Sequence, residues 1–214
     1  QIGSDIDGES SSDYFGWSVS LSSDGSVVAI GAPYDDGTST DAGHVRIYEN
    51  NNGTWTQIGS DIDGEASTNY LGHSVSLSDD GSIVAIGASH NDGGGTYSGH
   101  VRIYKNDNGT WTQIASDIDG ESSYDYSGYS QSGSAVSLSS DGSFVAIGAH
   151  QNDSGGSNSG HVRVYEDIGR NTLAFTTTDN IAPTLSSSTP ADNATLVALD
   201  SSIVLNFSEA VDVE

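Results

Sequence analysis

One pattern of apolar and polar residues occurs three times along the chain. In its first copy, residues 17–21 alternate apolar side chains with serine, a Ser-Asp-Gly turn follows, and Val27–Ile30 is apolar throughout. Alternation with a period of two predicts a half-buried β-strand, and a short unbroken apolar run between turns predicts a strand covered on both faces. The pattern returns in residues 71–88 and 136–149.

The three copies are in a fixed register. Three glutamines set a period of 56 residues (57 − 1 and 113 − 57): Gln1, Gln57 and Gln113. Three histidines follow at steps of 56 and then 61 residues, so the third copy has five extra residues within 124–133: His44, His100 and His161. Each copy is expected to add two further strands, which are His44–Tyr48 and Thr54–Ile58 in the first.

Four antiparallel strands in a unit of about 50 residues are typical of a β-propeller blade. We therefore predict an all-β fold of four-stranded antiparallel blades over residues 1–170, with copies at about 1–56, 57–112 and 113–170. Because propellers usually have about four to eight blades, three blades do not close a ring. Either the chain is part of a longer one, as its start in mid-repeat also suggests, or several copies complete one another.

Two short motifs in each copy add a resemblance to a known family. Phe15-Gly16 with Gly31-Ala32-Pro33 resembles the FG-GAP repeat of integrin α-subunit propellers and their bacterial relatives. The later copies keep the pattern loosely, as Leu71-Gly72 with Gly87-Ala88, and as Ser132-Gly133 with Gly148-Ala149. In that family the loop between the first two strands often carries a calcium site. Here this loop is only Ser-Ser-Asp-Gly, so calcium is not expected at the family's position.

The repeat stops at Arg170, and the remaining residues have a different character. Residues 171–182 are expected to be a linker. Residues 183–214, with Pro183, Pro190 and the run Ile203–Ser208, resemble the opening strands of a bacterial Ig-like domain. About thirty residues are too few to close a sandwich of about 100 residues. This segment is therefore the N-terminal part of such a domain or a strand-exchange tail.

The charge balance excludes several partners. Five Lys and Arg against thirty Asp and Glu give a net charge of −25. Such a surface repels phosphate backbones and anionic membranes, so nucleic acid is not an expected partner. No apolar run approaches the ~18 residues that a membrane-spanning helix needs. There is no cysteine, so no disulfide stabilises the chain.

The acidic residues form candidate metal sites. Each copy carries an Asp-x-Asp-Gly-Glu motif, in which alternating carboxylates, a turn-permitting glycine and hard oxygen ligands suit Ca²⁺. The alternative is a solvated turn in which aspartate caps backbone amides. The candidate calcium ligands are Asp5, Asp7, Glu9, Asp13, Asp61, Asp63, Glu65, Asp117, Asp119, Glu121 and Asp125. The alternation of strands and loops places most of these acids on one rim, beside the three histidines, which we expect to pack at strand starts rather than bind metal.

No pattern in the sequence predicts catalysis. There is no Gly-x-Ser-x-Gly motif, and identical loops repeated three times argue against one asymmetric active site. We therefore expect an extracellular or cell-surface protein that acts in adhesion or forms filaments, by binding and assembly, and is stabilised by calcium. Its expected partners are other copies, neighbouring domains of a longer chain, or an extracellular protein or polysaccharide ligand. The alternatives are an accessory module of a secreted carbohydrate-active enzyme and a purely structural surface-layer or fibre component.

Overall fold

The fold is all-β. The computed structural model describes residues 1–121, 135–166, 175–176, 185–189, 204–207 and 212–213. Every regular element in these residues is a strand, and all strand pairs are antiparallel. The chain divides into two compact units, residues 1–170 and residues 171–214. No helix in the described part of the chain is long and apolar enough to cross a membrane.

The first sheet confirms the four predicted strands. Its strands follow the order β1-β2-β3-β4, and β5 pairs with the other end of β3. The strands are β1 (Ser18–Leu21), β2 (Val27–Ala32), β3 (His44–Asn51), β4 (Thr54–Gln57) and β5 (Ile62–Asp63). The β3–β4 turn contains Asn52 and Gly53 with φ of 52° and 88°, the left-handed pair that a tight two-residue hairpin requires.

The second and third sheets repeat this plan. The second has the same five strands: β6 (Leu71–Leu77), β7 (Ile83–Ala88), β8 (His100–Asp107), β9 (Thr110–Gln113) and β10 (Ile118–Asp119). The third has three strands in the described residues: β11 (Ala135–Leu138), β12 (Phe144–Ala149) and β13 (His161–Glu166). The two-residue strands β5 and β10 were not predicted, because they lie inside the acidic motifs that the sequence indicates as loops.

The second unit contains two short strand pairs. Strand β14 (Phe175–Thr176) pairs with β17 (Asp212–Val213), and β15 (Leu185–Thr189) pairs with β16 (Val204–Phe207). The predicted strand at 203–208 therefore corresponds to β16.

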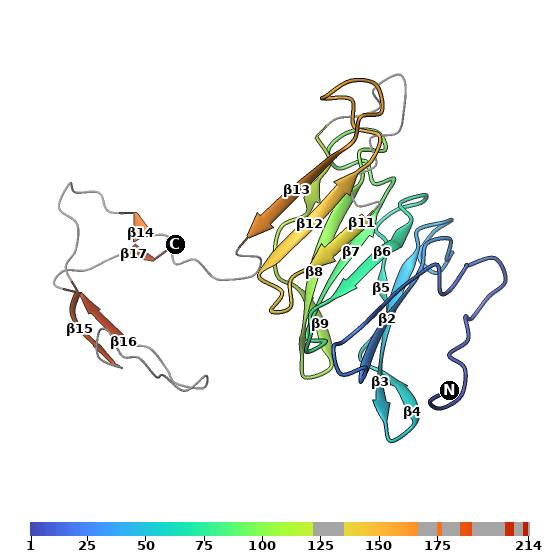
Figure 1. The fold of residues 1–214 in the computed structure, drawn as a ribbon, viewed down its shortest axis with the longest axis horizontal. Coiled ribbons are helices and arrows are strands. Elements are labelled where there is room, and N and C mark those ends of the chain that lie inside the picture. Colours follow the sequence, from blue (N-terminus) through green and yellow to red (C-terminus); the bar gives the residue numbers. More distant parts are fainter. Residues whose placement is uncertain (122–134, 167–174, 177–184, 190–203, 208–211, 214) are drawn as a thin grey trace. The chain divides into compact units, whose positions relative to one another are not determined.

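The three sheets of the first unit stack face to face in chain order, as blades do (Figure 1). The apolar residues of β6 pack onto β2 and β3: Val75 and Leu77 belong to one buried cluster with Val45 and Ile47. A second cluster joins the next two sheets in the same way, through Val101 and its neighbours. The core therefore consists of the layers between successive sheets.

Serine alternates with apolar residues in β1 and β6 because the two faces of each strand meet different neighbours. Val75 and Leu77 face the preceding sheet. Ser20 faces the following sheet, where its hydroxyl accepts a hydrogen bond from the backbone N–H of Leu77 at 3.0 Å. Ser76 accepts one from Leu138 at 2.9 Å in the same manner. The alternation thus describes a strand between two sheets, with hydroxyl groups bonding one of them.

The two glycines of the recognised motifs meet at the junction between sheets. A Cβ atom on Gly31 would lie 2.1 Å from the carbonyl oxygen of Gly72 and 2.5 Å from Oγ of Ser18. Gly72 itself has φ of 87°, and a Cβ there would lie 2.5 Å from the carbonyl oxygen of His44. The close approach of the two backbones explains why this position needs glycine on both sides.

Candidate functional site

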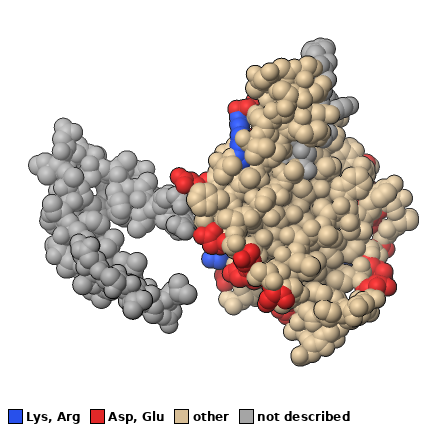
Figure 2. Space-filling view, in the orientation of Figure 1, with Lys and Arg blue, Asp and Glu red and all other residues tan. Residues whose placement is uncertain are grey.

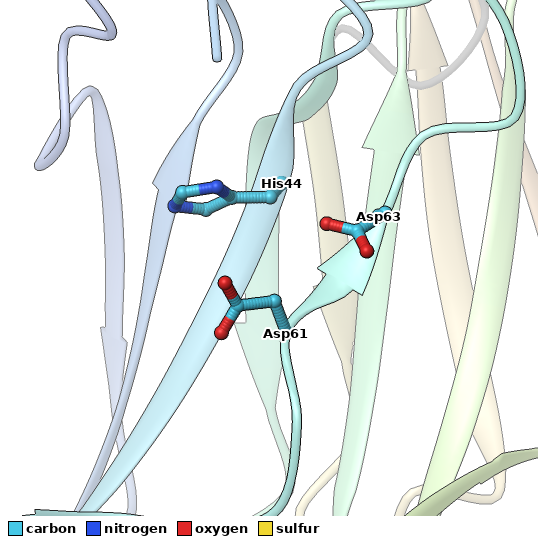
Figure 3. Close-up of side chains that lie close together, drawn as sticks. All are labelled: His44, Asp61 and Asp63. Carbon is cyan, nitrogen blue, oxygen red and sulfur yellow. The ribbon is translucent and has the colours of Figure 1, made fainter. Parts of the chain in front are cut away.

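The acidic motifs lie next to the histidines that begin β3 and β8. In the first sheet His44 is directly opposite Asp63 on the β3–β5 ladder, and in the second His100 is opposite Asp119. Figure 3 shows Asp61 and Asp63 on the segment beside the strand that carries His44. Ligand atoms of these three residues lie within 4.8 Å of one another. Both histidines are buried, so they pack at the strand starts.

An arginine joins successive acidic motifs. Arg46 contacts Glu9 of the first motif, and its Nη2 lies 2.9 Å from Oδ2 of Asp61 in the second. The guanidinium is buried, whereas Glu9 is exposed. The arginine therefore links the loop that precedes its own sheet to the segment between β4 and β5.

The second repeat has the same link with better geometry. Arg102 contacts Glu65 and binds Asp117 through two hydrogen bonds, of 3.1 Å from Nε and 3.0 Å from Nη2. In the third repeat Arg163 contacts Glu121. Sequence reasoning missed these arginines, although a signal existed. Three of only five basic residues stand two positions after the repeated histidine.

These contacts set the charge state of the motif aspartates. Burial acts to raise the pKa of Asp61, but hydrogen bonds from Arg46 and Gln57 outweigh it and hold this pKa below its usual range. For Asp63 burial comes first as well, and the neighbouring charge of Asp61 adds to it, so that pKa is raised. Within one motif the first aspartate is therefore held as an anion, while the second is a weaker acid.

The remaining predicted ligands lie in different surroundings. Asp5 is exposed and accepts a hydrogen bond from Nε2 of Gln1 at 2.7 Å, as Asp61 does from Gln57 at 2.6 Å. Asp7 is exposed, Asp13 is buried, and Asp125 lies outside the described residues. The structure thus brings the motif residues together around arginines, and calcium binding by them stays a prediction.

Acidic side chains do not cover the molecule evenly. Figure 2 shows them in separate groups, with much of the face in view free of charged residues. The two outer sheets of the first unit also expose apolar side chains. Val19 and Leu21 of β1 are 64% and 60% exposed, and Val162 and Val164 of β13 are 69% and 67% exposed.

A row of aromatic rings crosses the first two repeats. Neighbouring rings have centroids 4.7–6.1 Å apart and meet at angles between 57° and 86°. The row consists of Tyr14, Trp17, Tyr34, Tyr70, His90 and Tyr97. Tyr14 and Trp17 are exposed at one end of it. The side chains at this end can contact a ligand.

Comparison with protein families matches one segment in each unit. Residues 6–48 match the model of the FG-GAP repeat, and residues 179–214 match that of a bacterial Ig-like domain. Both resemblances seen in the sequence are therefore confirmed. FG-GAP and bacterial Ig-like domains are typical of extracellular or surface proteins and are generally not catalytic. They indicate a repeat module of the adhesion type.

Comparison with individual proteins gives only distant likenesses. Among the curated proteins no match was found. Hydrazine synthase from Kuenenia stuttgartiensis is 11% identical over 76% of this chain and 36% of that one, with a TM-score of 0.44. TolB from Acinetobacter baumannii is 16% identical over 92% of this chain and 42% of that one, with a TM-score of 0.41. This chain thus spans less than half the length of either structure.

Proposed function

We propose that this chain is a binding and assembly module of an extracellular or cell-surface protein, and that its copies join head to tail through their outer sheets. The observation that carries the proposal is the exposure of Val19 and Leu21 at one end and of Val162 and Val164 at the other. Adhesion and filament formation are the roles that such a module fits.

The interface between the first two sheets is a template for the contact between copies. Val162 and Val164 occupy the positions of Val45 and Ile47, which are 0% and 2% exposed because β6 covers them. Val19 and Leu21 occupy the positions of Val75 and Leu77, which form that cover. A second copy that places its β1 on β13 would therefore repeat a contact that the chain already makes twice.

Charged groups at the two ends are complementary in the same register. Arg46 and Arg102 each contact a glutamate and the first aspartate of the next motif. Arg163 contacts Glu121, and Asp5 is the first aspartate of the motif that begins the chain. In a head-to-tail pair, Asp5 of one copy would take the second position on Arg163 of the other.

The expected affinity is modest. Burying a Val or Leu side chain fully contributes about 1.5–3 kcal/mol, so four side chains that are about two-thirds exposed contribute roughly 4–8 kcal/mol. Association costs about 4–15 kcal/mol in lost motional freedom. The apolar contact alone therefore leaves little net free energy, and assembly should depend on the Arg163 ion pair and on concentration.

Light scattering over a concentration series tests the proposal. The wild-type chain should grow in mass with concentration, whereas Val164→Lys should stay at the mass of one chain, with an unchanged melting temperature because residue 164 is already exposed. A matched control is Thr110→Lys, an exposed strand residue away from both outer faces. A single-chain mass for the wild type at all concentrations would refute assembly of copies and favour neighbouring blades of a longer chain as the partner.

Calcium ions would stabilise the loops that contain the Asp-x-Asp-Gly-Glu motifs. The arginines contact the glutamate of each motif and the first aspartate of the second and third motifs. The middle carboxylates take no part in the arginine contacts and are the ones left for a cation: Asp7, Asp63 and Asp119. A melting temperature that falls on addition of EDTA, and recovers with Ca²⁺, would support this part of the proposal.

The aromatic row supports a second candidate, an accessory module that holds a secreted carbohydrate-active enzyme on a polysaccharide. Aromatic faces bury large areas against sugar rings at low entropic cost. Retention of the chain on insoluble polysaccharides, lost in Trp17→Ala and kept in Trp55→Ala, would support it. Trp55 is the control because its Nε1 is bonded to the carbonyl oxygen of Ile2, at 3.1 Å, outside the row.

A further inference from the structure

The first repeat contains a pair of buried carboxylates that the second repeat replaces with amides. Asp13 comes before β1 and is 5% exposed, and Asp35 follows β2 and is 8% exposed. One period later the same positions hold Asn69 and Asn91, which are also buried. The two repeats otherwise share strands, turns and the adjacent histidine, so the second is an internal reference for the first.

The amide pair shows how these side chains face each other. Nδ2 of Asn91 donates a buried hydrogen bond to Oδ1 of Asn69 at 3.3 Å, and Oδ1 of Asn91 accepts the Gly93 N–H at 2.7 Å. Oδ1 of Asp35 accepts the Gly37 N–H at 2.8 Å in the same way. Oδ2 of Asp35 therefore occupies the position that Nδ2 has in Asn91. An ionised carboxylate oxygen has no hydrogen to donate, so it cannot form the bond that Asn91 forms.

The hydrogen-bonding partners within the described residues do not satisfy this pair. Oδ2 of Asp13 is buried and has no hydrogen-bond partner among them, and the same holds for Nε2 of His44. His44, which is 2% exposed, reaches Asp35 with its other ring nitrogen, Nδ1, at 3.1 Å from Oδ1. Arg46 is engaged by Glu9 and Asp61. Two buried carboxylates placed as Asn69 and Asn91 are placed would be unfavourable unless a positive species lay between them.

We propose that Asp13 and Asp35 bind a divalent cation, for which Ca²⁺ is the best suited ion, and that this site belongs to the first repeat alone. Carboxylate oxygens are the ligands that Ca²⁺ prefers, and a buried pair of them supplies two charges against the ion's two. The site is distinct from the repeated acidic motifs, whose first aspartates bind arginine. It shares no residue with the apolar outer faces, and both of its carboxylates belong to one chain.

The second repeat supplies a variant that should fold. Asp13→Asn with Asp35→Asn rebuilds the hydrogen-bonded pair of Asn69 and Asn91 in the first repeat. After removal of metal with a chelator, calorimetric titration with Ca²⁺ alone should show one site more in the wild type than in the double variant. At about 100 times the Kd of this site, Ca²⁺ should raise the melting temperature of the wild type by roughly 5–10 °C more than that of the double variant.

A charge-matched control separates this site from the general acidity of the surface. Glu49→Gln with Asp107→Asn removes two exposed carboxylates elsewhere and should bind Ca²⁺ as the wild type does. Equal Ca²⁺ binding by the wild type and the double asparagine variant would place the ions in the repeated motifs and overturn the proposal. A second contrary result is a wild type that binds no Ca²⁺ and loses stability as the pH rises above the pKa of a carboxyl group in the unfolded chain. This result would show that the two carboxylates share a proton, and it would also overturn the proposal.

Discussion

Replacement of Gly31 by alanine tests the structural basis of blade stacking. The added Cβ would lie 2.1 Å from the carbonyl oxygen of Gly72, whereas ordinary contacts begin at 3.4 Å. The two sheets would have to separate locally by about 1.3 Å (3.4 − 2.1). The same Cβ would stand 2.5 Å from Oγ of Ser18, the hydroxyl that donates to the Gly72 carbonyl at 2.7 Å.

The cost follows from these two effects. Overfilling a well-packed contact costs about 1–3 kcal/mol, and loss of the Ser18 hydrogen bond adds about 1 kcal/mol. Gly31→Ala should therefore lower the free energy of unfolding by roughly 2–4 kcal/mol. For a chain of this size that corresponds to a fall of roughly 5–15 °C in melting temperature.

Gly148 provides the matched control, because it is the same position in the third repeat. There the described atoms nearest to an added Cβ are those of Ala135, at 3.5 and 3.7 Å. Gly148→Ala should be neutral, or more stable by up to about 1 kcal/mol through the unfolded chain. Urea unfolding followed by circular dichroism measures both variants. Equal losses for the two would show that the glycines serve strand conformation and would refute the explanation by close approach.

Three further predictions concern single contacts. Arg102→Leu should lower the free energy of unfolding by about 2–4 kcal/mol because it leaves two carboxylates without their buried partner, whereas Arg163→Leu, at a more exposed position, should cost at most about 1 kcal/mol in denaturant titrations. Backbone and side-chain hydrogen bonds from Ser26 lower the pKa of Asp24 to about 2. The stability that this turn contributes is therefore fully present above pH ~4 and is lost as the pH falls toward the folded-state pKa. Asp24→Asn should flatten this part of a plot of melting temperature against pH. Trp111→Phe should cost about 1 kcal/mol in urea unfolding, because it removes the hydrogen bond from Nε1 to the carbonyl oxygen of Ile58 in the preceding repeat, at 2.9 Å.

Much of the fold could be predicted because its determinants are local and repeated. Val27–Ile30 is apolar on both faces, and Asn52-Gly53 specifies its own turn, so strands and hairpins follow from short stretches. Short stretches of sequence could not predict that a strand with alternating serines, such as β6, is covered on both faces. Ser76 looks like a solvent-facing residue until a third sheet supplies the N–H of Leu138 that its hydroxyl accepts.

The candidate sites were predicted less completely, for a related reason. The pairing of Arg46 with Asp61 joins residues of two successive motifs, and composition shows only that the charges exist. The sequence pattern of Asp-x-Asp-Gly-Glu indicates a cation loop, yet its first aspartate faces a guanidinium. Which carboxylates remain for a metal depends on these contacts, and they become visible only when the sheets are stacked.

Comparison between repeats separates stacking from specific function. Positions that are the same in every copy, such as the arginine that contacts the glutamate of its own motif, make the same contact in each sheet and need no further explanation than stacking. Positions that differ between copies are not required for stacking. Asp13 and Asp35 are replaced by Asn69 and Asn91 in the second repeat, where the two amides form the hydrogen bond that two ionised carboxylates cannot form. A pair of buried carboxylates in one repeat is unfavourable for stacking alone, so a bound cation is the physical reason that best accounts for it.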